Sequence, residues 1–185
     1  MMALVMLITL FPVTTAYAAG WAGSGTATDP YLIVTQDDLM QMKFASAGEF
    51  YKLQNDITVD SEFETVYSFS GYFNGNGKTI SGINAFVTVE KAGNAQATTI
   101  TGSLFNRIEK SAAVYNLTLE SPKFSHSFGD GVSGRPGFYG GILSRYNAGL
   151  IDSVTINNAD VDLSYNYVNS SNTVQIDGFG MLCYE

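Results

Sequence analysis

The feature that most constrains this chain is a short motif that recurs at a fixed interval. Gly-x-Leu begins at Gly102, Gly141 and Gly180, so that 39 residues separate each copy from the next. A constant period in this range is typical of repeat architectures, in which each repeat is one structural unit that stacks on its neighbours. The spacing therefore predicts a fold built from successive, equivalent units.

An apolar pattern follows the glycines. The pattern of residues 114–124 recurs 37 residues on, in residues 151–161. The matched pairs are Val114 with Ile151, Leu117 with Val154, Leu119 with Ile156, and Phe124 with Val161. A weaker copy begins at Ile80-x-x-Ile83. In a parallel β coil, successive turns stack about 4.8 Å apart, so aligned inward positions need the same apolar type. The pattern favours such a coil.

Composition limits the classes of function. The chain has 185 residues, of which 45% are hydrophobic and 14% charged, and this balance suits one folded domain. Nineteen glycines, eleven tyrosines and twelve phenylalanines favour strands and turns over helices. The net charge of −8 argues against a nucleic-acid partner, which selects a basic surface.

Residues 1–18 are interpreted as a signal peptide. Residues 2–13 form an apolar run that is short for a transmembrane helix, and Ala16-x-Ala18 provides a small-x-small cleavage site after Ala18. No Lys or Arg precedes the run, which departs from the usual pattern. We therefore expect export, to the medium or the cell surface. Cys183 is the only cysteine, so no internal disulfide can form.

Residues 19–28 are interpreted as a Gly/Ala/Ser/Thr linker, and residues 29–68 as an N-terminal cap with the first strands. Thr35 followed by Asp38 is a capping-box pattern and predicts a short helix. Further on, Asn74-Gly75-Asn76-Gly77 predicts a tight turn, because Asn and Gly tolerate positive φ. Three residues of the extended segment between them are expected to point inward: Tyr51, Leu53 and Ile57.

Three segments carry a family resemblance. They read Gly23-Ser-Gly-Thr-x-x-Asp29-Pro30-Tyr31-Leu32-Ile33, Tyr51-x-Leu53-x-x-Asp56-Ile57, and Phe69-x-Gly71-x-Phe73-Asn74-Gly75-Asn76-Gly77-x-Thr79-Ile80. Together they resemble the leading part of bacterial surface β-helix proteins, and Gly102-Ser-Leu-Phe105 is similar to the GLUG motif of that group. Such modules occur in adhesins and in non-catalytic regions of IgA-type metallopeptidases. The resemblance implies an all-β, right-handed parallel β-helix, a solenoid with a short N-terminal helix cap and rungs over residues 69–185.

Loops are expected between the repeated strands, near residues 89–98, 126–137 and 165–175. They follow the apolar pattern at a similar phase, so they should project from one side, and such insertions often form the binding face of a repeat protein. Rings, amides and charges in or beside them suit sugar recognition, with packing over the corner of the coil as the alternative. The candidate ligand-binding residues are His126, Phe128, Asp130, Arg135, Tyr165 and Tyr167.

Most catalytic motifs are excluded by counting. His126 is the only histidine, so a His-Glu-x-x-His zinc site cannot exist, and the peptidase activity of the larger relatives is not carried here. No Gly-x-Ser-x-Gly elbow is present. The alternating acids Asp60-x-Glu62-x-Glu64 and Asp160-x-Asp162 are interpreted as strands with one solvated face, with a calcium site as the alternative. We expect neither a metal nor a cofactor.

These observations predict a secreted, non-catalytic cell-surface β-helix module, adhesin-like or a spacer. Carbohydrate and a host or matrix surface are the partner hypotheses. One alternative is a fragment of a calcium-dependent polysaccharide lyase or hydrolase, and another is a structural stalk without a ligand. Residues 180–185 stop where a new rung would begin, so the β-helix is expected to be incomplete at its C-terminus. The chain would then be part of a longer protein, or its open edge would self-associate.

Overall fold

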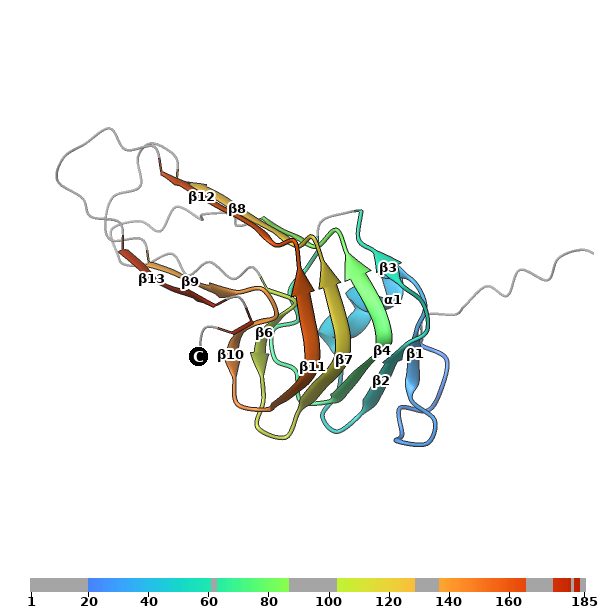
Figure 1. Cartoon of the computed structure of the whole chain (residues 1–185). Helices are drawn as coiled ribbons and strands as arrows, with labels where there is room; N and C mark the ends of the chain where they lie inside the picture. Colours follow the sequence, from blue (N-terminus) through green and yellow to red (C-terminus); the bar gives the residue numbers. More distant parts are fainter. Residues whose placement is uncertain are drawn as a thin grey trace, which may run out of the picture.

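The computed structural model describes residues 20–60, 63–86, 103–128, 137–165, 175–180 and 182–183. Within these ranges the chain is mostly β, with parallel sheets and one short α-helix near the N-terminus (Figure 1). The expected signal peptide, residues 1–18, lies outside the described residues. No helix in the described ranges is long and apolar enough to cross a bilayer.

One large parallel sheet, here called the main sheet, organises the molecule. Its strands follow the order β1 (Tyr31–Ile33), β2 (Phe50–Leu53), β4 (Tyr72–Ser81), β7 (Ala113–Glu120) and β11 (Leu150–Asn157), and β3 (Ile57–Thr58) also pairs with β4. Figure 1 shows these strands side by side.

Three smaller parallel sheets complete the described strands. They are β5 (Asn84–Phe86) with β8 (Lys123–Phe128) and β12 (Asp160–Tyr165), β6 (Phe105–Ile108) with β10 (Ser144–Asn147), and β9 (Gly137–Gly141) with β13 (Gln175–Gly180). In Figure 1 the pairs β8–β12 and β9–β13 extend away from the main sheet toward the same side.

The register confirms the repeat. Opposite each other in β7 and β11 lie Val114 and Ile151, Leu117 and Val154, and Leu119 and Ile156, while Phe124 of β8 lies opposite Val161 of β12. The 39-residue interval is confirmed in the β6–β10 sheet, where Ser144 pairs with Phe105 on one side and with Cys183 on the other. Apolar residues one period apart therefore stack in neighbouring parallel strands.

The weaker copy lies at a different phase from the one expected. Ile80 pairs with Leu119, and the residue opposite Val114 is Phe73. The register shifts between Asn74 and Lys78, because residues 75–77 of β4 lie opposite a single residue of β7. The interval between paired residues is therefore 41 before this local insertion, from Phe73 to Val114, and 39 after it, from Ile80 to Leu119.

The Asn74–Gly77 segment is not the tight turn that the sequence predicts. It lies inside β4, which continues to Ser81 with parallel partners on both sides, so the chain does not reverse there. The expectation of positive φ is confirmed for the second pair only, with φ of 54° at Asn76 and 68° at Gly77, whereas neither Asn74 nor Gly75 has a positive φ. The segment is an irregularity within the strand that carries the register shift, similar to a β-bulge.

Left-handed residues recur at matching levels of neighbouring strands. Asn116 (φ 55°) lies opposite Ser153 (φ 53°), and the strand ends carry Ser121 (φ 49°) and Asn158 (φ 51°) at equivalent positions. Such φ values are uncommon outside glycine. The Asn158 amide donates to Glu120 at 2.7 Å, and this hydrogen bond lowers the pKa of the Glu120 carboxyl. Because the left-handed residues lie opposite each other in neighbouring strands, successive strands bend at the same two levels.

The predicted N-terminal helix is confirmed as α1 (Gln36–Met40), which continues into the 3-10 helix η1 (Gln41–Phe44). Its capping box is complete, with the Thr35 hydroxyl accepting from the Asp38 amide at 3.2 Å and the Asp38 carboxylate accepting from the Thr35 amide at 2.9 Å. Such a cap is worth about 1 kcal/mol. Figure 1 shows α1 behind the main sheet.

The segment expected as a linker instead packs on the fold. The indole of Trp21 lies 5.3 Å from the ring of Tyr31 and 5.2 Å from that of Tyr51, and its N–H donates to the Asp38 carbonyl at 2.9 Å. Ala22 forms an antiparallel bridge with Leu32 of β1. Residues 20–28 thus cover the first strand of the main sheet.

The core lies between the main sheet and the β6–β10 sheet. Phe73 of β4 and Phe69 lie 6.1 and 4.8 Å from the ring of Phe105 on β6, and each of the three is at most 1% exposed. The residues expected to point inward, Tyr51, Leu53 and Ile57, are at most 3% exposed. Their burial confirms the alternation read from the sequence.

Candidate ligand-binding surfaces

The candidate residues from the loops are only partly placed. His126 and Phe128 lie on β8 and Tyr165 on β12, where the register sets Phe128 opposite Tyr165. The structure therefore brings the backbones of Phe128 and Tyr165 together. Asp130, Arg135 and Tyr167 lie outside the described residues, as does the expected loop at 89–98.

The bounds of the expected loops differ from the observed strands. β8 continues through Phe128 and β9 begins at Gly137, so the first three residues and the last residue of the segment 126–137 are strand. Tyr165 and Gln175 likewise belong to β12 and β13. The parallel partners extend the strands beyond the point where the apolar pattern ends.

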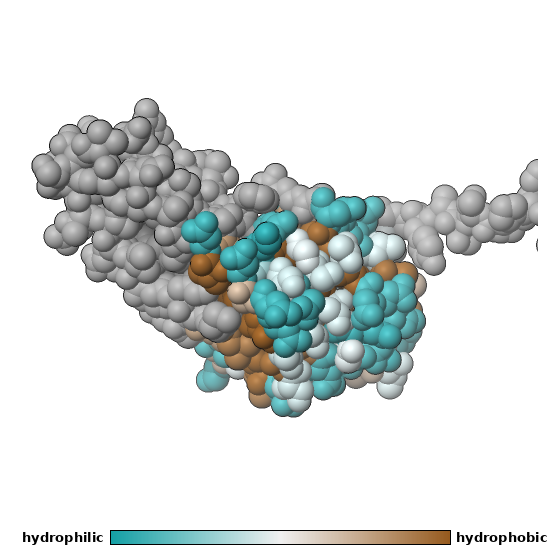
Figure 2. Space-filling view, turned by 45° about the horizontal axis from the view of Figure 1, so that its top comes forward, coloured by the Kyte–Doolittle hydropathy of each residue, from teal (hydrophilic) through white to brown (hydrophobic). Residues whose placement is uncertain are grey.

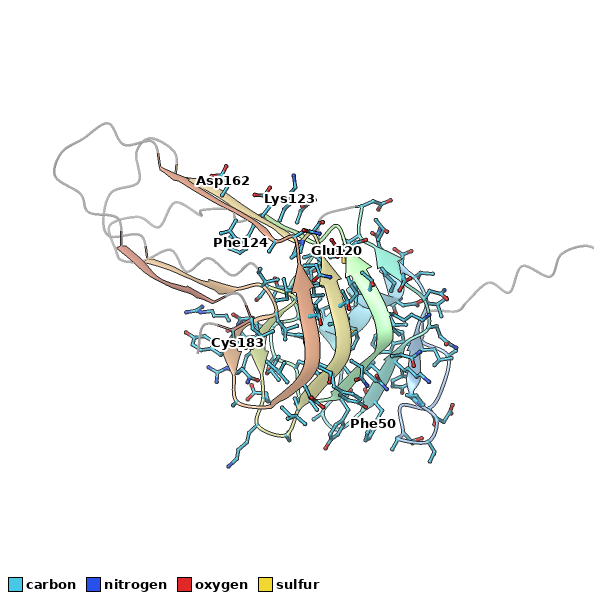
Figure 3. The ribbon with its side chains drawn as sticks, in the orientation of Figure 1. Phe50, Glu120, Lys123, Phe124, Asp162 and Cys183 are labelled. Atoms are coloured by element: carbon cyan, nitrogen blue, oxygen red, sulfur yellow. The ribbon has the colours of Figure 1, made fainter. Side chains whose placement is uncertain are left out.

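The described part of the β8–β12 pair carries a solvated face. Phe124 is 2% exposed and turned inward, while Lys123 and Asp162 are exposed (Figure 3). The Lys123 ammonium lies 3.7 Å from the Asp160 carboxylate in an exposed ion pair. Asp160 and Asp162 thus lie on a strand with solvent-facing acids, as predicted, and such pairs contribute little to stability.

The other acidic set does not form the expected strand. Asp60 and Glu64 lie outside strands, and Glu62 is not among the described residues. The Gln36 amide donates to Asp60 at 2.8 Å and also accepts from its backbone, while Glu64 pairs with Lys43. Within the described residues, no group of three His, Cys, Asp or Glu side chains is placed to hold a metal ion.

Cys183 occupies a structural position opposite Ser144 in the β6–β10 sheet. Burial raises the pKa of its thiol. A nucleophilic cysteine needs the opposite shift, because the thiolate is the reactive form. This environment favours a structural role for Cys183 over a role as a nucleophile.

Two of the three arginines converge on one ring. The guanidinium groups of Arg107 and Arg145 lie 4.8 and 4.5 Å from the ring centre of Tyr146. Glu109 is 4.0 Å from Arg107 and accepts from the Ser68 hydroxyl at 2.8 Å. Cation–π contacts of this kind tie neighbouring strands together at the surface.

A hollow on the outer face of the main sheet escaped the sequence analysis. It measures about 230 Å³ and lies where a loop meets strands β2, β4 and β7. Its lining includes Thr28, Pro30, Phe50, Lys52, Asn74 and Tyr115. The available signal was the alternation in β2, where Phe50 and Lys52 face outward between the buried Tyr51 and Leu53. Figure 2 shows hydrophobic and hydrophilic residues interspersed on the face that it draws.

Beneath this hollow, the phenol of Tyr51 is held in the core. Its hydroxyl donates to the Glu49 carboxylate at 2.6 Å and accepts from the Ser46 amide at 3.1 Å. Burial, with the Glu49 hydrogen bond second, raises the pKa of Tyr51 beyond its ordinary range. The folded chain thus retains this proton at a pH where the unfolded chain releases it, above about pH 10.

We expect the free energy of unfolding to fall as the pH rises above about 10, and to fall less steeply in Tyr51→Phe. Urea unfolding from pH 8 to 11 measures the two slopes. Tyr67→Phe removes a phenol from a residue that is 79% exposed and is the matched control. Equal slopes for Tyr51→Phe and the wild type would contradict the assignment of this pH dependence to Tyr51.

Comparison with known proteins gives one informative similarity. No protein-family model matches the chain, and no solved structure matches it. The chain is similar to halomucin from Haloquadratum walsbyi, with 29% identity over 143 residues, which cover 71% of this chain. The chain spans only 1% of the length of that relative. The similarity is thus to one small segment of a very long protein.

Proposed function

We propose that this chain is a non-catalytic module of an exported cell-surface protein, folded as a right-handed parallel β-helix. It would act as an adhesin-like element or spacer that contacts glycans. The observation that carries the proposal is the parallel register of residues 37 to 39 positions apart, repeated in neighbouring strands. Stacking of this kind gives a rigid, extended surface, which suits display and binding rather than a catalytic cleft.

The similarity to halomucin supports the location. The name of that relative is that of a mucin, and this is the support that the similarity gives to a surface or secreted location. The apolar run before Ala18 is consistent with export. The pairs β8–β12 and β9–β13 project to one side of the main sheet, and β8 and β12 carry His126, Phe128 and Tyr165, three of the residues expected to bind glycans.

Protease treatment of intact cells tests the location. An antibody against residues 19–185 should detect a product that external protease removes without lysis. A product protected until the cells are lysed would contradict export.

An activity assay tests the absence of catalysis. The purified chain should release no product from acidic polysaccharides in the presence of Ca²⁺. Release of unsaturated oligosaccharides would instead support the lyase alternative.

A further inference from the structure

The hollow on the main sheet has a fixed wall. The loop of residues 24–30 is closed by hydrogen bonds from the amides of Ser24 and Thr26 to the Asp29 carbonyl, each 3.1 Å long. The Phe50 amide donates to the Gly25 carbonyl at 2.9 Å and so attaches this loop to β2. Because these bonds hold the loop against the sheet, the hollow is a preformed feature of the fold.

Phe50 in the lining of the hollow stacks on a neighbouring ring outside it. Phe50 and Tyr72 lie opposite each other in β2 and β4, and their rings stack with centres 4.4 Å apart and planes 10° apart. Both side chains are half-buried on the outer face, and Phe50 is labelled in Figure 3. Tyr115 lies one strand further on, in register with Asn74. Phe50 and Tyr115 thus line the hollow with half-buried rings, and Tyr72 supports Phe50 from outside the lining.

Three polar side chains of the hollow have no partner among the described residues, and a fourth, Asn74, keeps its NH₂ group available. Among the described residues, the Lys52 ammonium, the Tyr115 hydroxyl and the Thr28 hydroxyl make no hydrogen bond or ion pair within the chain. The side-chain oxygen Oδ1 of Asn74 accepts from the backbone amide of Asn76 at 2.8 Å. This bond holds the Asn74 side chain in place and leaves its NH₂ group available.

Elsewhere on the outer face of the main sheet, polar groups form hydrogen bonds with each other. Thr58 and Ser81 share a hydrogen bond of 3.1 Å, and the Asp56 carboxylate accepts from the Thr79 amide at 2.8 Å. The hollow combines rings and polar groups that remain available to a ligand.

We propose that this hollow binds one pyranose ring of a neutral polysaccharide. The exposed rings would cover the apolar C–H face of the sugar, and the groups of Lys52, Asn74 and Tyr115 would bond its hydroxyls. The volume of about 230 Å³ is below the roughly 300–1,000 Å³ typical of small-molecule pockets, so the hollow would hold no more than one ring of a polysaccharide. This proposal rests on the proposed function and adds a glycan site distinct from β8 and β12.

The charges favour a neutral sugar over an acidic one. Lys52 is the only charged residue in the lining and by itself would attract an anion, but the exposed Asp152 lies opposite Tyr115 on the next strand, β11, and offsets that charge. The chain as a whole carries a net charge of −8. These negative charges would repel a uronic acid polymer or a nucleic acid at ordinary ionic strength.

An array of immobilised oligosaccharides tests the site. It carries neutral oligomers of glucose, mannose, galactose and N-acetylglucosamine beside oligomers of the uronic acids, and it is probed with the chain lacking residues 1–18. The wild type should bind a neutral set. Phe50→Ala and Tyr115→Ala should each weaken that binding about tenfold. Phe44→Ala and Tyr67→Ala, which remove rings that are 71% and 79% exposed elsewhere, should leave it unchanged.

The outcomes separate this proposal from the broader one. Neutral-sugar binding that survives Phe50→Ala and Tyr115→Ala but is lost in Phe128→Ala/Tyr165→Ala would overturn the hollow and leave the proposed glycan contact intact. Binding confined to uronic acids, or no binding by the wild type, would also overturn it. Urea unfolding followed by emission of Trp21, the only tryptophan, checks that each variant is folded.

Discussion

Gly75→Ala should lower the free energy of unfolding by about 3 kcal/mol, at the upper end of the range for overpacking. A Cβ at this position would lie 2.4 Å from the Asn116 carbonyl oxygen and 2.6 Å from the Leu117 Cα. Both atoms belong to the backbone of β7, so no flexible side chain can move aside. The neighbouring strands would have to separate at the bulge. Urea unfolding monitored by Trp21 emission and circular dichroism measures the change.

Gly77→Ala provides the matched control two residues away. A Cβ there would meet no atom within 4 Å, but φ is +68°. The variant should therefore lose only the 1–2 kcal/mol expected for an L-residue in the left-handed region. Gly77→Asn should lose less, because Asn tolerates this conformation. Equal losses for Gly75→Ala and Gly77→Ala would show that close approach of β7 is not the reason for glycine at position 75.

These two glycines also show what the sequence could reveal. Asn-Gly pairs favour positive φ, and that expectation was correct for Asn76-Gly77 but not for Asn74-Gly75. They do not say whether the chain reverses, because the outcome depends on which strands pair on either side. Here β4 is held between parallel neighbours, and the same residues form a bulge. Local preference was therefore readable, while its tertiary use was not.

The pairing of β7 with β11 could be predicted because stacked positions need similar side chains. Leu117 opposite Val154 and Leu119 opposite Ile156 satisfy that requirement through the hydrophobic effect alone. The left-handed Ser153 gave no such signal, since serine has no strong preference for positive φ. Its conformation follows from its place opposite Asn116, where the neighbouring strand bends at the same level.

The hollow could not be predicted for a related reason. Thr28 ends a segment whose composition is typical of a flexible linker, and Pro30 lies just beyond that segment. Their position over Phe50 and Tyr115 arises from contacts between residues far apart in the sequence, beginning with Trp21 on Tyr51. A concave site made by a loop and three strands has no continuous sequence pattern. The candidate ligand-binding residues of the loops could be proposed from the sequence because histidine, rings and charges cluster there locally.

Phe105→Ala should lower the free energy of unfolding by about 3–5 kcal/mol, as expected when a buried ring leaves a cavity. Phe105 is 1% exposed and pairs in register with Ser144. Its ring contacts those of Phe69 and Phe73 and so joins the β6–β10 sheet to the main sheet. Because small domains have only about 5–15 kcal/mol of stability in total, a large fraction of it depends on this contact.

The contact that Phe105 makes between the two sheets leads to a second prediction. If the two sheets fold as one unit, Phe105→Ala should shift a single unfolding transition, with Trp21 emission and circular dichroism changing together. Phe44→Ala, which removes a ring that is 71% exposed, should change the stability by less than about 0.5 kcal/mol. A loss for Phe105→Ala that is no larger than for Phe44→Ala would contradict the core packing. Two separate transitions in the wild type would instead mean that the main sheet and the β6–β10 sheet unfold independently. That result would contradict coupling of the two sheets through the shared aromatic core.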